Sequence, residues 1–109
     1  MQYLRTRLAT NFSKPSTLWE KLISYATSNP GYRGKFHRVR AWLIEFDEEG
    51  KPYREVGLDE NDSVVLAGPG KNDYGFWLDT NMRYSDFTGE SVTMEYFETK
   101  WAASGVVAP

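Results

Sequence analysis

The chain contains no cysteine and only one histidine, and each shortage excludes a class of chemistry. Without cysteine the protein has no disulfide bond and no thiolate zinc site, and we expect it in a reducing compartment. A nucleophilic triad would have to combine His37 with serine or threonine, and the sequence has no Gly-x-Ser-x-Gly motif. We therefore expect a protein that is not an enzyme and that uses no metal or cofactor.

Long apolar segments are also missing from the sequence. No window approaches the roughly 18 apolar residues of a membrane-spanning helix. Residues 1–20 hold no apolar core of the length found in signal peptides. We therefore expect a cytoplasmic protein that does not contact the membrane.

Aromatic residues and acids are plentiful. Trp, Tyr and Phe make up 16% of the 109 residues, enough to fill the core of a small domain or to form an interaction surface. Residues 1–40 hold eight Lys and Arg and one acid, whereas residues 41–109 hold five Lys and Arg and fourteen acids. This split produces oppositely charged faces unless the fold interleaves the two halves. The length predicts one compact domain over residues 1–109.

Hydrophobic periodicity predicts both strands and helices. The predicted strands are 2–8, 36–46, 53–58, 63–67 and 75–79, with a turn at 47–52 and a loop at 81–90. A first helix is predicted over Ser16–Ser28, and a second begins after Thr93, its N-cap, and ends at Gly105. The fold class is α+β: a mostly antiparallel sheet of about five strands with two helices packed on one face.

The predicted strand 36–46 does not alternate cleanly between apolar and polar residues. One explanation is a bulge near Arg40–Trp42, which would bring Val39 and Trp42 to the same face. The other is a central strand whose second half is covered on both faces. Only the second explanation requires this strand to lie at the centre of the sheet.

The run Val92–Trp101 (VTMEYFETKW) resembles the closing helix of small bacterial immunity proteins that neutralise polymorphic toxins of the contact-dependent inhibition type. Their pattern is an aliphatic residue, Ser or Thr, any residue, two Glu, Phe, Glu, two variable residues and Trp. Tyr96 stands where the second Glu would be, and Met1–Leu4 is similar to their first strand. The resemblance implies a cytoplasmic antitoxin that blocks the active site of one toxin domain. Such families share no fixed binding residues, so none is carried over.

The acids around the predicted hairpin form a candidate surface for a protein partner. Complementary charge speeds association and selects the partner, and exposed aromatic side chains anchor the centre of an interface. On this hypothesis the chain is a non-enzymatic toxin inhibitor that binds a basic toxin domain. The predicted binding residues are Asp47, Glu48, Glu49, Tyr53, Glu55, Asp59, Glu60 and Asp62.

Residues 32–40 support an alternative, because they interleave basic and aromatic side chains as nucleic-acid-binding surfaces do. The acidic isoelectric point, near 5.4, opposes nucleic-acid binding. We therefore expect these residues to form a solvated strand face rather than a nucleic-acid surface. The alternative is a small nucleic-acid-binding protein or ribonuclease that uses Arg33, Lys35, His37, Arg38 and Arg40, with Glu45 as a further acid–base group. A third hypothesis is a phage-encoded inhibitor of a host defence complex.

Overall fold

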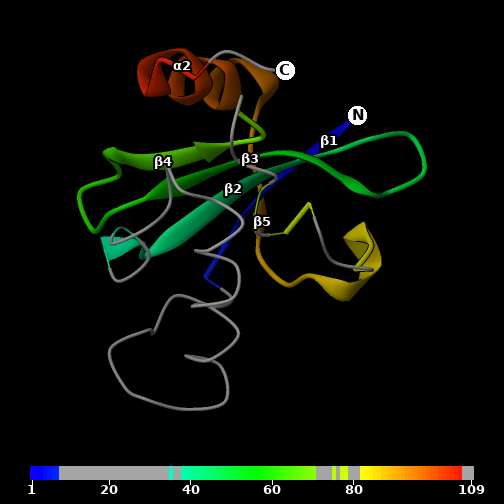
Figure 1. The fold of residues 1–109 in the computed structure, drawn as a ribbon. Helices are drawn as coiled ribbons and strands as arrows, with labels where there is room; N and C mark the ends of the chain where they lie inside the picture. Colours follow the sequence, from blue (N-terminus) through cyan, green and yellow to red (C-terminus); the bar gives the residue numbers. More distant parts are fainter. Residues whose placement is uncertain (8–34, 36–37, 71–74, 76, 79–81, 107–109) are drawn as a thin grey trace.

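A five-stranded antiparallel sheet organises the domain in the computed structural model (Figure 1), which describes residues 1–7, 35, 38–70, 75, 77–78 and 82–106. Its strands are β1 Gln2–Thr6, β2 Ala41–Phe46, β3 Pro52–Leu58, β4 Val64–Gly68 and β5 Glu90–Ser91. Their spatial order is β4-β3-β2-β1-β5, and all neighbours are antiparallel. The helix α2, Met94–Ser104, covers one face, and the 3-10 helix η3, Tyr84–Asp86, lies on the other side.

The central strand β2 is buried along its whole length. Trp42, Ile44 and Phe46 point to one face of the sheet, whereas Ala41 and Leu43 contribute to a separate cluster on the other face. Burial on both faces explains why the sequence pattern does not alternate between apolar and polar residues. The prediction of a covered central strand is confirmed. The ladder between β2 and β3 is irregular at Glu45/Phe46 rather than near Arg40–Trp42.

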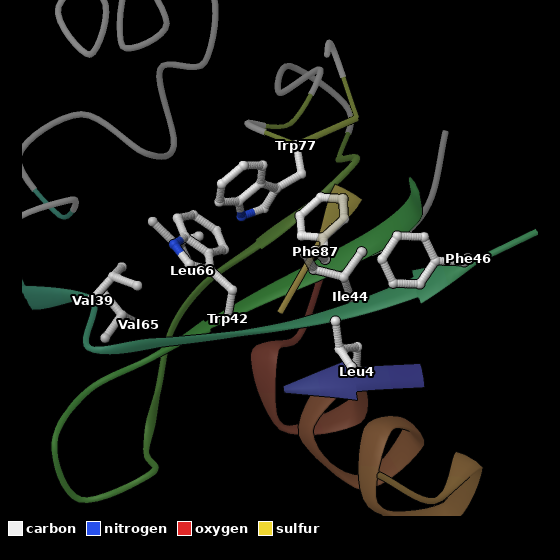
Figure 2. Packing of buried hydrophobic residues seen from close by; sticks show 9 residues of the cluster. All are labelled: Leu4, Val39, Trp42, Ile44, Phe46, Val65, Leu66, Trp77 and Phe87. Carbon is white, nitrogen blue, oxygen red and sulfur yellow. The ribbon is translucent and has the colours of Figure 1, made fainter. Parts of the chain in front are cut away.

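The face opposite α2 carries a cluster that we call the aromatic core (Figure 2). Figure 2 shows Trp77 and Phe87 lying over the side chains that β2 points to this face. The ring centroids of Trp77 and Trp42 lie 6.1 Å apart, and those of Phe87 and Phe46 lie 5.2 Å apart, both in edge-on geometry. Such pairs contribute roughly 0.5–1.5 kcal/mol beyond burial. The members are Leu4, Val39, Trp42, Ile44, Phe46, Val65, Leu66, Trp77 and Phe87.

The segment predicted as a strand at 75–79 does not form one at its described residues. The backbone N–H groups of Trp77 and Leu78 donate to the Glu55 carboxylate, at 2.7 and 3.2 Å. These amides therefore bond to a side chain instead of a neighbouring strand. Trp77 instead lies over the sheet as part of the aromatic core, so the strand prediction is wrong at the described residues of this segment.

The face under α2 carries the helix-side core, formed by Ala41, Leu43, Val56, Leu58, Ala67 and Phe97. The predicted ends of α2 are confirmed. The Thr93 hydroxyl accepts a hydrogen bond from the N–H of Tyr96 at 3.1 Å, which satisfies one of the free amides at the helix start. Gly105 ends the helix in the left-handed conformation, with φ of 70°.

Several predicted boundaries need correction. The strand predicted from residue 36 begins at Ala41 and is preceded by a 3-10 turn that includes Arg38. The loop predicted over 81–90 contains η3 and the start of β5. The helix predicted over 16–28 lies outside the described residues, so α2 is the one α-helix in the described part of the chain. No helix among the described residues is long and apolar enough to span a membrane.

Candidate partner-binding surface

The turn between β2 and β3, Asp47–Lys51, is held by its own first residue, and we call it the acidic turn. The Asp47 carboxylate accepts the backbone N–H groups of Glu49 and Lys51, at 2.9 and 3.0 Å. Gly50 adopts φ of 80°, which lets the chain turn back into β3. The side chains of Glu48 and Glu49 remain exposed. The turn thus presents carboxylates on a fixed backbone.

The segment around η3 braces the acidic turn from the side. The backbone N–H of Tyr84 donates to the carbonyl oxygen of Gly50 at 2.8 Å, and the Arg83 guanidinium donates to the carbonyl oxygen of Glu49 at 3.2 Å. The Tyr84 ring packs edge-on against Phe46, with centroids 5.1 Å apart. Sequence analysis missed this contact, because it joins segments more than thirty residues apart.

The turn between β3 and β4, residues 59–63, repeats the same construction. The Asp59 carboxylate accepts the backbone N–H groups of Asn61 and Ser63, at 2.8 and 3.0 Å. The hydrogen bonds from Ser63 and then Asn61 lower the pKa of Asp59. Asp62 occupies the position in this turn that Gly50 occupies in the acidic turn, and it also adopts a positive φ, of 60°. This turn also carries an exposed carboxylate, that of Glu60.

Basic side chains neutralise the second turn. The Arg5 guanidinium of β1 forms an ion pair with the Asp62 carboxylate at 2.8 Å, and this hydrogen bond raises the pKa of Arg5. The Lys100 ammonium of α2 donates to the carbonyl oxygen of Asp62 at 2.6 Å. Arg38 is close enough to lower the pKa of Asp59 further, after the backbone bonds. The two charged halves of the sequence are therefore interleaved at this end of the sheet.

The predicted acidic residues do not form one surface. The two turns lie at opposite ends of the seven-residue strand β3, roughly 20 Å apart at the rise of an extended chain. Glu55, between them, is fully buried against the Trp77 segment and is not available to a partner. Tyr53 lies beside the acidic turn and is 55% exposed. The exposed groups that the structure brings together are thus Glu48, Glu49 and Tyr53.

A buried ion pair between β2 and β3 was not predicted from the sequence. Glu45 is only 2% exposed, and its carboxylate accepts hydrogen bonds from Arg54 at 2.7 and 2.9 Å and from the Tyr3 hydroxyl at 2.8 Å. Burial alone would raise the pKa of Glu45, but the bonds from Arg54 and Tyr3 outweigh it and lower this pKa. Glu45 is thus structural in the described geometry, rather than poised for proton transfer.

Arg54 extends this network to α2. Its guanidinium forms an ion pair with Glu98 and lies over the rings of Phe97 and Trp101, at 5.0 and 4.9 Å from their centroids. The hydrogen bond to Glu45, partly opposed by burial, raises the pKa of Arg54. A periodicity argument identifies neither contact, because both depend on the register between β2 and β3 and on the position of α2.

The residues of the nucleic-acid alternative are described only in part. Lys35, Arg38 and Arg40 are exposed before β2, whereas Arg33 and His37 lie outside the described residues. Glu45 is at the opposite end of β2 from these basic residues and faces the helix side. Among the described residues, the structure therefore does not bring Lys35, Arg38 or Arg40 together with Glu45.

A comparison with models of protein families, with curated proteins and with solved structures finds no match to this chain. The binding surface is therefore inferred from the chain's own residues. Beyond the two turns, the described surface has a shallow depression of ≈ 490 Å³ beside Arg5, lined by Arg5, Asp62, Glu90, Val92, Thr93 and Tyr96. Among the described residues no group of His, Cys, Asp and Glu could hold a metal ion.

The left-handed conformation of Asp62 gives a test of how the second turn is held. Asp62→Ala is expected to lower the free energy of unfolding by about 1–2 kcal/mol, because alanine is strained at positive φ. Asp62→Gly should stay within about 1 kcal/mol of the wild type, since it removes this strain but loses a partly buried ion pair with Arg5. Urea unfolding measures both changes, with Glu60→Ala as the control. Equal losses for the two Asp62 variants would show that the ion pair, not the backbone, decides stability.

Proposed function

We propose that this chain is a non-enzymatic toxin inhibitor of the immunity type, which covers the active site of a basic toxin domain with the acidic turn and Tyr53. The observation that carries this proposal is the acidic turn itself. Asp47, Arg83 and Tyr84 fix its backbone, while the Glu48 and Glu49 carboxylates face solvent. A fixed backbone reduces the entropy that binding would otherwise cost.

The exposed groups of this surface have complementary tasks in binding. The carboxylates attract a cationic groove and accelerate association. Tyr53 adds a large side chain with two rotatable angles, the kind of residue that often dominates interface energies. The ion pair of Glu49 with Lys51, 3.3 Å long and exposed, contributes at most about 1 kcal/mol and can be exchanged for a partner's cation.

Docking through the turn fits better than addition of a strand beside β5 or beside the first half of β3. The edge strand β5 has two residues, and one of them is the exposed, charged Glu90. The first half of β3, which β4 does not cover, begins with Pro52 and has a bulge in its ladder with β2. Short strands, charges, proline and bulges all oppose edge pairing. A turn tip has no such obstacle.

Single charge reversals test the proposal. Purified wild-type protein would be used to capture a partner from lysates of toxin-bearing bacteria, and the captured protein would be expressed alone and with the chain. We expect it to stop growth alone and to be neutralised by the wild type. Glu48→Lys should weaken the complex by about 2 kcal/mol, roughly 30-fold. The matched reversals Glu60→Lys and Glu95→Lys, on the second turn and on α2, should change affinity less than threefold.

Two results would contradict the proposal. A captured protein that does not inhibit growth excludes a toxin, and a subunit of a host defence complex would favour the phage-inhibitor hypothesis with the same surface. Equal effects of Glu48→Lys and Glu60→Lys would exclude the acidic turn as the binding site. The comparison of the two reversals does not depend on their stability, because Glu48 and Glu60 are both exposed.

The exposure of Lys35, Arg38 and Arg40 favours nucleic-acid binding as the second candidate. Labelled RNA and DNA would be titrated with the protein at two salt concentrations. Binding that weakens steeply with salt, and that Arg38→Ala reduces, would support this candidate over the inhibitor. We expect no such binding, since Asp59 lies near Arg38 and its carboxylate repels phosphate.

A further inference from the structure

The helix α2 is attached to the sheet by few buried side chains. All eleven of its residues are described, and Phe97 is the one that is buried. Tyr96 and Trp101 are half-buried against the helix-side core, and Met94 is 53% exposed. The sheet beneath is different, because Leu43, Val56 and Leu58 are fully buried there. The helix thus covers the apolar side chains of the sheet but buries few apolar side chains of its own.

Polar contacts fasten the two flanks of α2. On one flank Glu98 pairs with Arg54, which the buried carboxylate of Glu45 holds on the sheet. On the other flank Lys100 reaches the carbonyl oxygen of Asp62. The Glu98 side chain is 47% exposed, so the helix half of the first contact is open to water while the sheet half is buried. Contacts of this kind are weakened by salt and contribute modestly to stability.

The main chain gives α2 little further attachment. The last described backbone bond between the sheet and the segment leading to α2 joins the Val92 N–H to the Tyr3 carbonyl, at 3.1 Å. Among the described residues, the backbone bonds of 94–104 are then made within the helix or at its caps. By contrast, β2 is bonded to β1 on one side and to β3 on the other.

We infer that α2 is a lid that opens as a unit about Val92–Thr93 while the sheet remains folded, with the Arg54–Glu98 pair as its fastening. Opening uncovers the helix-side core and leaves Arg54 bonded to Glu45. The free energy of such local opening is set by the contacts of α2 and by the apolar surface that it uncovers, and it is smaller than that of global unfolding. This inference does not depend on the proposed function, because the acidic turn is not part of the lid.

Native-state hydrogen exchange of the full chain tests the lid. The mid-helix amides of residues 98–102 should exchange at least tenfold faster than those of Leu43 and Val56. The exchange rates of these helix amides should share one weak dependence on urea. Glu98→Gln should speed exchange across α2 by about two- to threefold and leave β2 unchanged. Glu48→Gln, an exposed acid on the acidic turn and outside the lid, should change neither.

The opposite results overturn the inference. If α2 and β2 exchange at one rate with one urea dependence, the helix does not open separately. If the α2 amides differ among themselves in urea dependence, the helix frays from its end and does not move as a unit. If Glu98→Gln and Glu48→Gln have the same effect, the pair with Arg54 is not the fastening. A fluorescence change of Trp101 would not be sufficient, since four tryptophans contribute to that signal.

Discussion

Replacing Arg54 with methionine is expected to lower the free energy of unfolding by about 3–5 kcal/mol at pH 7. The substitution leaves the Glu45 carboxylate buried without the guanidinium that donates two of its hydrogen bonds. The Tyr3 hydroxyl remains as a donor, but it brings no charge. Methionine preserves most of the packing against Phe97 and Trp101, so the fall in unfolding free energy measures the loss of the guanidinium charge. Urea unfolding at fixed pH measures the change.

Two control variants separate the buried pair from the exposed one. Glu98→Gln removes the exposed partner of Arg54 and should cost less than about 1 kcal/mol. The double variant Arg54→Met with Glu45→Leu removes both buried charges and should recover most of the loss, because apolar residues can replace a buried pair. An Arg54→Met loss no larger than that of Glu98→Gln would mean that water reaches Glu45 freely.

The pH dependence of this effect has a defined sign. In the wild type the pKa of Glu45 in the folded state is below its ordinary value of 4.5. Its stabilising contribution is therefore complete above the pKa of the unfolded state and is lost as pH falls through the folded pKa. In Arg54→Met burial raises the folded pKa instead, so the penalty is relieved as pH falls. The difference between variant and wild type should shrink from pH 7 to pH 4.

Local signals in the sequence predicted the central hairpin and α2. The Asp47 and Gly50 positions carry the residues that such a turn requires, and Thr93 and Gly105 carry the caps of the helix. Neither β5 nor its place in the sheet could be predicted. A two-residue strand has no measurable periodicity, and its pairing with β1 joins residues more than eighty positions apart.

The sequence identified the acids but not their environments. Asp62 and Glu48 are both turn residues, yet Asp62 is neutralised by Arg5, 57 positions away, and Glu48 is exposed. Glu55 was predicted to face a partner, but the second half of β3 is covered on both faces and the carboxylate bonds to the Trp77 amide. Tertiary contacts thus decide which of the predicted acids face solvent. They leave Glu60 exposed at one end of β3, and Glu48, Glu49 and Tyr53 exposed at the other end.

Gly89→Ala is expected to separate β5 from β1 and to cost about 3 kcal/mol, the upper part of the range for overpacking. A methyl group at this position would overlap the carbonyl oxygen of Arg5 and lie 3.2 Å from the Cα of Thr6. These atoms belong to the backbone of β1, which cannot retreat because β2 holds its other edge. Urea unfolding gives the loss, and exchange of the β1 amides reports the separation of the strands.

Gly105→Ala is the matched control for Gly89→Ala, because its methyl group meets no atom within 4 Å. Its cost arises from φ of 70° alone and should be about 1 kcal/mol. If Gly89→Ala costs no more than this, the segment leading into β5 can absorb the methyl group by moving. The close approach would then be incidental. A larger loss with faster exchange at Arg5, whose amide faces β5, means that this contact determines where the sheet ends and how α2, which follows β5, is placed over it.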